Sequence, residues 1–170
     1  MSNPGGLVRR PCEPEPLERF DMSTTTAEIP KETAAQRPVL AGPIAYLIVD
    51  GARKAAEFYK RAFGAEESGC VQEDDSGRTM HIHLFVNNGS LMLSDAFPEH
   101  GVPLEKPQGF MLHLQVDDVD AAWNRAVEAG ADIVMPLEIA FWGDRYGQLR
   151  DPFGVLWSLG GPPEPRRPSN

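Results

Sequence analysis

Three histidines are the residues of this sequence best suited to chemistry. His81 and His83 lie two residues apart in the run Met80–Val86, and on a strand that spacing places both side chains on the same face. His113 lies in a second apolar run, Phe110–Val116. Neutral imidazole binds divalent metals and can act as a general base near neutral pH. The pattern fits a metal or general-base site, and it also fits hydrogen-bonded histidines on a half-buried face, because no carboxylate partner is obvious.

A compact aromatic cluster is the second candidate for function. Phe141, Trp142 and Tyr146 surround a turn that also carries Asp144 and Arg145. One interpretation is an aromatic wall with a charged pair that closes over a flat ligand, where stacking and cation–π contacts give affinity. The other is that Trp142 covers an open sheet edge, while the charged pair is exposed and contributes little. The sequence favours neither interpretation.

The remaining reactive residue types point away from nucleophilic or phosphate chemistry. Ser94 and Asp95 are adjacent, but nothing resembles a nucleophile elbow. We expect Asp95 to cap or terminate a strand and Ser94 to line a pocket. There is no glycine-rich phosphate loop and no Cys/His cluster with zinc spacing. Trp123 and Trp157 are expected in the core, with Trp157 facing away from the pocket and packing under a helix.

The elements that position these residues occur twice in the same order. Periods of two and of 3.6 residues predict strand, helix and three strands in a first copy. Its elements are Pro43–Val49, a helix from Ala52 to Phe63 that Gly64 ends, Glu66–Gln72, Met80–Val86 and Leu91–Ser94. The second copy comprises Phe110–Val116, a helix from Val119 to Val127 that ends by Gly130, Ile133–Ile139, Gly147–Arg150 and Val155–Leu159.

The two copies can be superposed residue by residue. Placing Val49-Asp50 on Val116-Asp117 brings Tyr46 opposite His113. Both helices end in Gly-Ala. Matched order over so many elements favours an internal repeat over coincidence. We therefore predict an α+β fold of two βαβββ modules, residues 43–97 and 109–160, whose curled mixed sheets surround a pocket.

Composition separates this repeat from its flanks. Residues 1–38 are rich in Pro, Glu, Thr and Ser, so we predict a disordered N-terminal arm, within which Met22 offers an alternative translation start. The folded domain is expected over 39–161, followed by a disordered tail over 162–170. The two cysteines, Cys12 and Cys70, form no disulfide framework, and free thiols in a reducing cytoplasm are the simplest interpretation.

Charge excludes several partners. The chain has 16 Lys and Arg against 25 Asp and Glu, a net charge of −9. Such a surface repels phosphate backbones and anionic membranes, so we expect no nucleic acid and no membrane partner. No stretch is long enough to span a bilayer and no secretory signal is recognisable. A cytoplasmic location is expected.

Short motifs in the repeat resemble those of the vicinal oxygen chelate superfamily, the glyoxalase/bleomycin-resistance/dioxygenase proteins, and most closely its PhnB-like subgroup. The resemblance covers about residues 43–160. Its motifs are Tyr46–Gly51, Ala56–Tyr59, Ala62–Glu66, Met80-His81, Leu91–Ala96, Phe141–Gly147 and Asp151–Gly154. It implies two β-sheets curled around a pocket, and usually a homodimer.

The resemblance also implies where a metal would bind. Metal-dependent members place one ligand, typically His or Glu, in the first and the last strand of each module. Carried over, these positions are Ile44, Ser94, Met111 and Ser158. Hydrocarbon, thioether and hydroxyl groups are poor ligands for Zn, Ni, Fe or Mn. A register slip of two residues would bring in Tyr46 and His113, which restores one histidine only. No cofactor is predicted.

These observations favour a small-molecule-binding protein that sequesters a partly aromatic, perhaps cationic, ligand in an apolar pocket without the usual metal. The pocket residues expected are Tyr46, His81, Ser94, His113, Trp142, Tyr146 and Ser158. The alternative is a metal-dependent lyase, isomerase or dioxygenase with a relocated site around His81, His83 and His113. A third is an accessory protein with a vestigial pocket. Fold alone does not decide among them.

Overall fold

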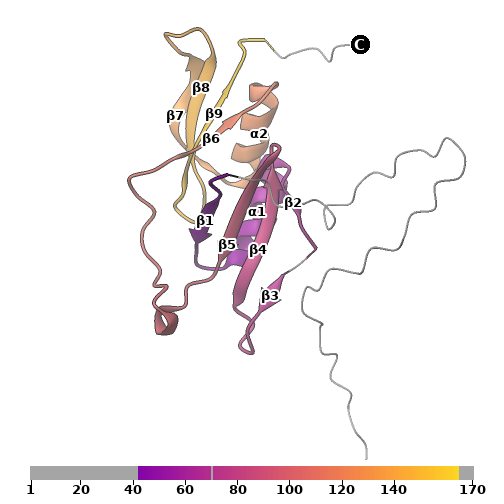
Figure 1. The fold of residues 1–170 in the computed structure, drawn as a ribbon. Helices are drawn as coiled ribbons and strands as arrows, with labels where there is room; N and C mark the ends of the chain where they lie inside the picture. The colour runs from indigo at the N-terminus through magenta and orange to yellow at the C-terminus, as the bar shows by residue number, and fades with distance from the viewer. Residues whose placement is uncertain (1–41, 70, 165–170) are drawn as a thin grey trace, which may run out of the picture. The chain divides into compact units, whose positions relative to one another are not determined.

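The first module runs from β1 to β5 in the computed structural model, which describes residues 42–69 and 71–164 (Figure 1). Its elements are β1 (Ala45–Ile48), α1 (Ala52–Phe63), β2 (Glu66–Glu67), β3 (Gln72–Glu73), β4 (Thr79–Val86) and β5 (Gly89–Ser94). The strand order is β1-β5-β4-β2, and β3 also pairs with β4. β1 runs parallel to β5, whereas β4 pairs antiparallel with its neighbours.

The second module repeats this arrangement. It comprises β6 (Leu112–Gln115), α2 (Val119–Ala129), β7 (Asp132–Ile139), β8 (Arg145–Arg150) and β9 (Leu156–Gly161), in the sheet order β6-β9-β8-β7. The Val49 N–H donates to the Ser94 carbonyl at 3.1 Å, and the Val116 N–H donates to the Gly160 carbonyl at 2.9 Å. Because Val49 and Val116 make the same bond, the superposition expected from the sequence is confirmed. The fold is α+β, with two βαβββ modules.

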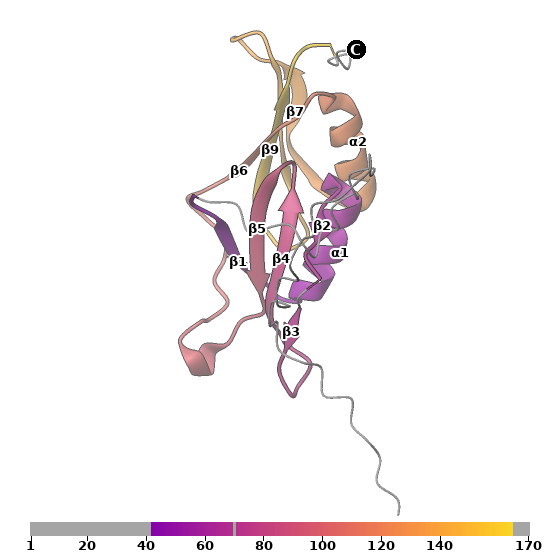
Figure 2. The ribbon, with the colours of Figure 1, turned by 45° about the vertical axis from the view of Figure 1, so that its right-hand side comes forward.

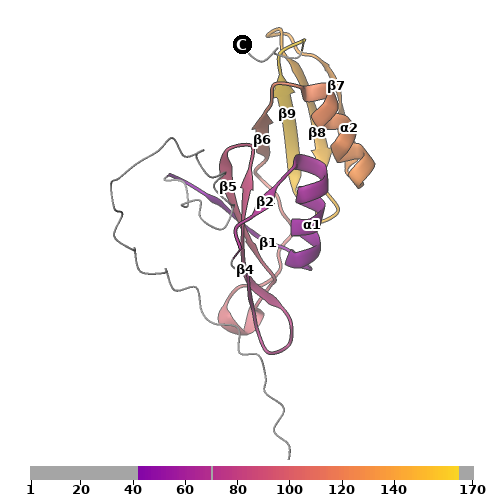
Figure 3. The same cartoon turned by 90° about the vertical axis from the view of Figure 1, so that its right-hand side faces the viewer.

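Both helices lie on the same side of the two sheets (Figure 2, Figure 3). The buried face of α1 comprises Ala52, Ala55, Ala56, Phe58, Tyr59, Ala62 and Phe63. Gly64 ends α1 with φ +66°, a left-handed conformation that favours glycine. The N-terminus of α2 is capped by Asp118, whose carboxylate accepts from the Ala121 N–H at 2.9 Å. Apolar periodicity and these end signals explain why both helices could be predicted.

Asp151, in the turn between β8 and β9, connects the two modules. This carboxylate is 3% exposed and accepts a 2.7 Å hydrogen bond from the Tyr59 hydroxyl on α1 and a 2.9 Å bond from the Trp157 indole. Its other oxygen accepts from the backbone of Phe153 and Val155, both at 2.9 Å. Burial and the charge of Asp151 raise the pKa of Tyr59, which therefore stays a donor. A fully hydrogen-bonded buried carboxylate thus links one module to the other.

Trp123 and Trp157 lie in the core, as the sequence predicts. Trp157 is 2% exposed, and its ring centroid is 4.5 Å from that of Phe63 on α1. Trp123 of α2 is 7% exposed. Both belong to the apolar core between the helices and the sheets. The expectation that Trp157 packs under a helix, away from the pocket face, is confirmed.

Some strand boundaries differ from the prediction. Glu66–Gln72 forms no continuous strand, because β2 and β3 pair with β4 in different registers: Glu67 lies opposite Leu84 and Gln72 opposite His81. β6 is shorter than expected, and Phe110 and Met111 precede it. The predicted N-terminal arm, most of the predicted C-terminal tail, Cys12 and Cys70 lie outside the described residues.

Candidate ligand-binding site

Alternation along the strands divides each sheet into a face toward the helices and an opposite face. On β4, Ile82, Leu84 and Val86 belong to the core, so His81 and His83, which alternate with them, point to the opposite face. On β1, Leu47 is in the core and Tyr46 is 48% exposed. The face opposite the helices therefore carries most of the side chains expected in a pocket. We call it the open face of each sheet.

Tyr46, His81 and Ser94 gather on the open face of the first sheet. The Tyr46 hydroxyl lies 3.2 Å from His81 Nδ1, and their ring centroids are 5.8 Å apart. Burial lowers the pKa of His81, so the imidazole is neutral near pH 7 and can accept a hydrogen bond from the Tyr46 hydroxyl. Ser94 pairs across the sheet with Ile48 and is 4% exposed. These contacts fix the Tyr46 ring beside the imidazole.

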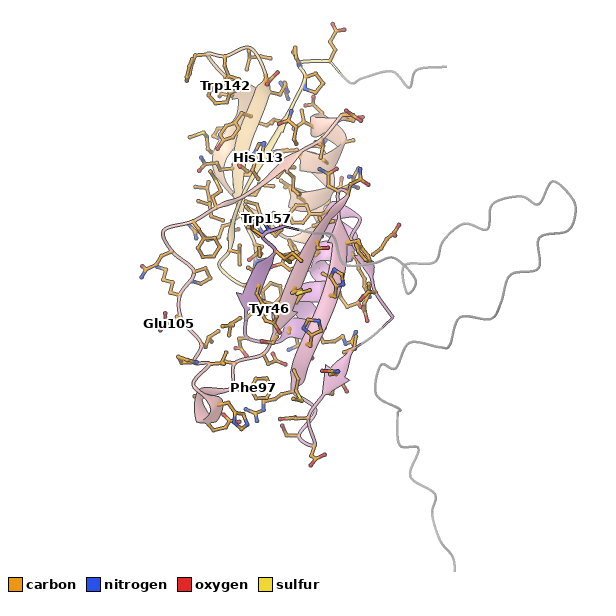
Figure 4. The ribbon with its side chains drawn as sticks, in the orientation of Figure 1. Tyr46, Phe97, Glu105, His113, Trp142 and Trp157 are labelled. Atoms are coloured by element: carbon orange, nitrogen blue, oxygen red, sulfur yellow. The ribbon has the colours of Figure 1, made fainter. Side chains whose placement is uncertain are left out.

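A cleft of about 530 Å³ opens beside these residues. It is lined by Tyr46, Ile48, Asp74, Arg78, Met80, Ser94, Phe97, His100 and Val102. Figure 4 shows Tyr46 on β1 and Phe97 next to η2 (Pro98–His100), a short helix in the linker. Both aromatic side chains line the cleft. A cleft of this size, mainly apolar with a few polar groups, has the character of a small-molecule site. We call it the first-sheet cleft.

His113 and Ser158 gather on the open face of the second sheet. They are cross-strand partners on β6 and β9, and the Ser158 hydroxyl lies 2.8 Å from His113 Nδ1. His113 Nε2 lies 3.1 Å from the Gln115 side-chain oxygen. An amide oxygen only accepts, so Nε2 donates to Gln115, while Nδ1 and the Ser158 hydroxyl share a hydrogen bond. A Cβ at Gly160 would lie 2.9 Å from His113 Cε1, so glycine lets the ring lie close to the sheet.

Trp142 and Tyr146 continue the aromatic surface of the second sheet. Tyr146 is stacked with His113 at a centroid distance of 6.2 Å, and Trp142 meets Tyr146 edge-on at 5.4 Å. Trp142 is 52% exposed and Phe141 is 98% exposed, so neither is a core residue. We call His113, Tyr146 and Trp142 the aromatic platform. Trp142 is accessible to a ligand, as an aromatic wall requires, and its place in the turn between β7 and β8 also fits a residue that covers a sheet edge.

The seven residues expected in the pocket thus form two groups on two sheets. Tyr46, His81 and Ser94 belong to the first sheet, His113, Tyr146 and Ser158 belong to the second, and Trp142 lies in the turn between β7 and β8. The sequence did not point to Arg78, Phe97 or Val102, which also line the first-sheet cleft. Phe97 and Val102 form an isolated bridge in a segment that reads as a proline-rich linker, so periodicity gave no signal for them.

Asp95 directly follows the last residue of β5, as expected, and its carboxylate has further partners. One carboxylate oxygen accepts from the Gly51 and Ala52 N–H groups at the start of α1, both at 2.8 Å, and the other accepts from the Thr79 N–H at 2.7 Å. Asp95 therefore caps α1 from the end of β5 and holds the first residue of β4. It positions the strands that carry the site.

The side chains present do not fit a divalent metal. Ser94 pairs with Ile48, and Ser158 pairs with His113, so neither serine lies directly opposite Ile44 or Met111. Nor are the two serines equivalent, since Ser94 corresponds to Gly160. His113 is the one strong ligand at these positions, and both of its ring nitrogens are hydrogen-bonded.

A relocated metal site finds no support in the geometry either. His81 and His83 lie on β4 of the first sheet, and His113 lies on β6 of the second. Across residues 42–69 and 71–164, no three His, Cys, Asp or Glu side chains gather as a metal would require. We derive no chemistry through a metal ion.

Comparisons with known proteins identify the class to which this fold and site belong. Residues 40–159 match the family model of the Glyoxalase/Bleomycin resistance protein/Dioxygenase superfamily. The chain belongs to this superfamily. Uncharacterized protein Rv0887c of Mycobacterium tuberculosis is 44% identical over 123 residues, covering 69% of this chain and 72% of the relative.

Solved structures agree with this assignment. Protein PA1353 of Pseudomonas aeruginosa has 29% identity and a TM-score of 0.58, covering 72% of this chain and 98% of the other. The PhnB protein of Bacillus cereus shares the fold at 21% identity and a TM-score of 0.55, covering 71% and 99%. Within the part of the chain that the structure describes, no helix has the length and apolar character needed to span a bilayer.

Proposed function

We propose that this protein binds a small, partly aromatic molecule in the first-sheet cleft and sequesters it without a divalent metal. The observation that carries the proposal is the lining of this cleft, in which Tyr46, Met80 and Phe97 surround a space of about 530 Å³. Aromatic and thioether groups bind flat rings through stacking and dispersion. A site of this kind binds its ligand without needing a metal to polarise it.

Polar groups at the cleft would orient the ligand. Ser94 supplies a hydroxyl, and the Tyr46 hydroxyl can exchange its bond to His81 for one to the ligand. The net charge of −9 favours a cationic molecule over an anionic one. The expected ligand class is therefore a flat aromatic molecule that carries a positive charge.

A fluorescence titration with aminacrine, a flat aromatic cation, tests the proposal. We expect saturable binding, with Tyr46→Ala raising the Kd about five- to tenfold because one stacking face is lost. Leu104→Ala is the matched control, because Leu104 is 52% exposed and lies outside the cleft lining. Equal Kd values for the two variants, or no saturable binding by the unmodified protein, would refute the proposal.

We further propose that two copies associate through their open faces. Large apolar side chains remain exposed on both sheets and in the turn between β7 and β8, among them Tyr46, Met80, Met135 and Trp142. Exposed apolar surface of this kind marks an interface. Association would place the aromatic platform of one copy against the first-sheet cleft of the other. Light scattering should give twice the 18.7 kDa mass of one chain, whereas a monomer at micromolar concentration would exclude this arrangement.

A further inference from the structure

A small hairpin in the linker separates two clefts. Phe97 and Val102 exchange two backbone hydrogen bonds, of 2.7 and 3.0 Å, and Gly101 closes the turn between them with φ +77°. Phe97 and Val102 both line the first-sheet cleft. We call Phe97–Val102 the partition hairpin.

Val102 also lines a second cleft. This cleft has a volume of about 600 Å³ and is lined by Tyr46, Leu47, Ile48, Gly101, Val102, Pro103, Glu105, Lys106, Pro107, Gln108, Phe110 and Val155. Tyr46, Ile48 and Val102 line both clefts. Figure 4 places Glu105 on the linker and Tyr46 on β1, and both line this second cleft. Moving Val102 away from β1 would join the two spaces.

Arg78 is the side chain that ties the partition hairpin to the first sheet. Its guanidinium lies 4.3 Å from the centre of the Phe97 ring, a cation–π distance, and 2.5 Å from the Glu99 carboxylate. The nitrogen that pairs with Glu99, Nη2, also lies 2.9 Å from Asp74, and Arg78 Nε donates to the same Asp74 oxygen at 3.0 Å. Arg78 therefore contacts the hairpin through a ring and a charge while staying anchored in the turn before β4.

The two ends of this link differ in strength. Asp74 accepts from the Ser76 hydroxyl and from the backbone N–H groups of Ser76 and Arg78, and the Ser76 bond is the largest cause that lowers the Asp74 pKa to about 2. The Glu99 end has one ion pair, with side chains 40% and 47% exposed. Exposed pairs of this kind contribute little, so the hairpin end is the one that can release.

We propose that the Arg78–Glu99 ion pair holds the partition hairpin closed and so selects ligands by size. A molecule that fits about 530 Å³ binds with the hairpin in place, whereas a longer molecule must displace Val102 to enter the second cleft. Size selection rests on the proposed function, but the link between Arg78 and the hairpin does not. Arg78 and Glu99 act here as positioning residues for Phe97 and Val102.

Two dyes of different length test the size selection. Aminacrine is an acridine cation, and quinacrine adds a branched diaminoalkyl chain to an acridine ring. We expect this chain to extend past Val102 into the second cleft. Glu99→Gln should tighten quinacrine binding relative to aminacrine by up to about fivefold, the range of an exposed ion pair. The loss of a negative charge would by itself weaken the binding of quinacrine, which carries more positive charge than aminacrine. Charge alone therefore predicts the opposite change. Asp75→Asn is the control, since no contact of the Asp75 side chain is known and it lines neither cleft.

A readout without ligand separates failure of this proposal from failure of the proposed function. Methyl relaxation of Val102 by NMR should show more microsecond-to-millisecond motion in Glu99→Gln than in Asp75→Asn or the unmodified protein. An unchanged Val102 methyl in Glu99→Gln, or an unchanged ratio of dye affinities, would overturn the proposed link. If neither dye binds any variant, the proposed function fails, and the Val102 methyl alone decides whether Arg78 holds the hairpin.

Discussion

The hydrogen bond between Tyr59 and Asp151 offers the most quantitative test of how the two modules are joined. Tyr59 is fully buried and Asp151 is 3% exposed, so no water can replace the 2.7 Å bond between them. Phenylalanine fills the same volume, so Tyr59→Phe removes the hydroxyl without leaving a cavity. A hydrogen bond to a charged group contributes about 2 kcal/mol. We expect Tyr59→Phe to lower the free energy of unfolding by that amount.

Removing the Asp151 carboxylate should lower the free energy of unfolding further, because this carboxylate accepts hydrogen bonds from four donors. Asp151→Ala leaves the Tyr59 hydroxyl, the Trp157 indole and two backbone N–H groups without their acceptor. We expect a loss of about 4 kcal/mol. In that background Tyr59→Phe should cost little further, so a double-mutant cycle should give a coupling of about 1.5–2 kcal/mol.

Urea unfolding followed by far-UV circular dichroism measures these free energies. A single transition is expected in each variant, because Tyr59 and Asp151 belong to different modules and join them into one cooperative unit. A cost below about 0.5 kcal/mol for Tyr59→Phe, or additive effects in the cycle, would show that this buried link does not stabilise the fold.

Three further predictions follow from single contacts. Burial lowers the pKa of His81 and His83 below the ordinary value of 6.5. On acidification, these two histidines therefore become protonated at a higher pH in the unfolded chain than in the folded protein. Stability should be full above about pH 6.5 and fall below it, and a His81→Gln/His83→Gln variant should lose part of this dependence when urea midpoints are compared at about pH 7.5 and about pH 5. Asp95→Ala should cost about 2 kcal/mol in urea unfolding, since three backbone N–H groups lose their acceptor. Gly147→Ala should lower the free energy of unfolding in urea by about 2 kcal/mol, because the new Cβ would lie 2.5 Å from the Trp123 ring.

Much of the fold could be predicted because local and repeated signals agree. The apolar face of α1, its end at Gly64 and the parallel order of the two modules all follow from periodicity. Cross-strand register could not be predicted in the same way. The structure pairs Ser94 with Ile48 and Ser158 with His113, and such pairs depend on hydrogen bonds between strands distant in sequence.

The site was predictable in part for the same reason. Alternation along β4 predicts which face of the sheet carries His81. In the structure, His81 lies on that face, beside Tyr46. Arg78 and Phe97 were missed, because a guanidinium over a ring depends on how a linker folds back on the sheet. Linkers carry no periodicity, so their contacts become visible only in three dimensions.

Aminacrine titration of protein treated with a chelator tests the central claim, that the first-sheet cleft binds a flat aromatic molecule without a metal. The donor set at the strand positions contains one histidine, whose ring nitrogens already have partners. We therefore predict the same Kd before and after EDTA treatment, and no change when one equivalent of zinc or manganese is added. Binding that disappears with EDTA and returns with either metal would contradict the account and make a metal-dependent enzyme the better description.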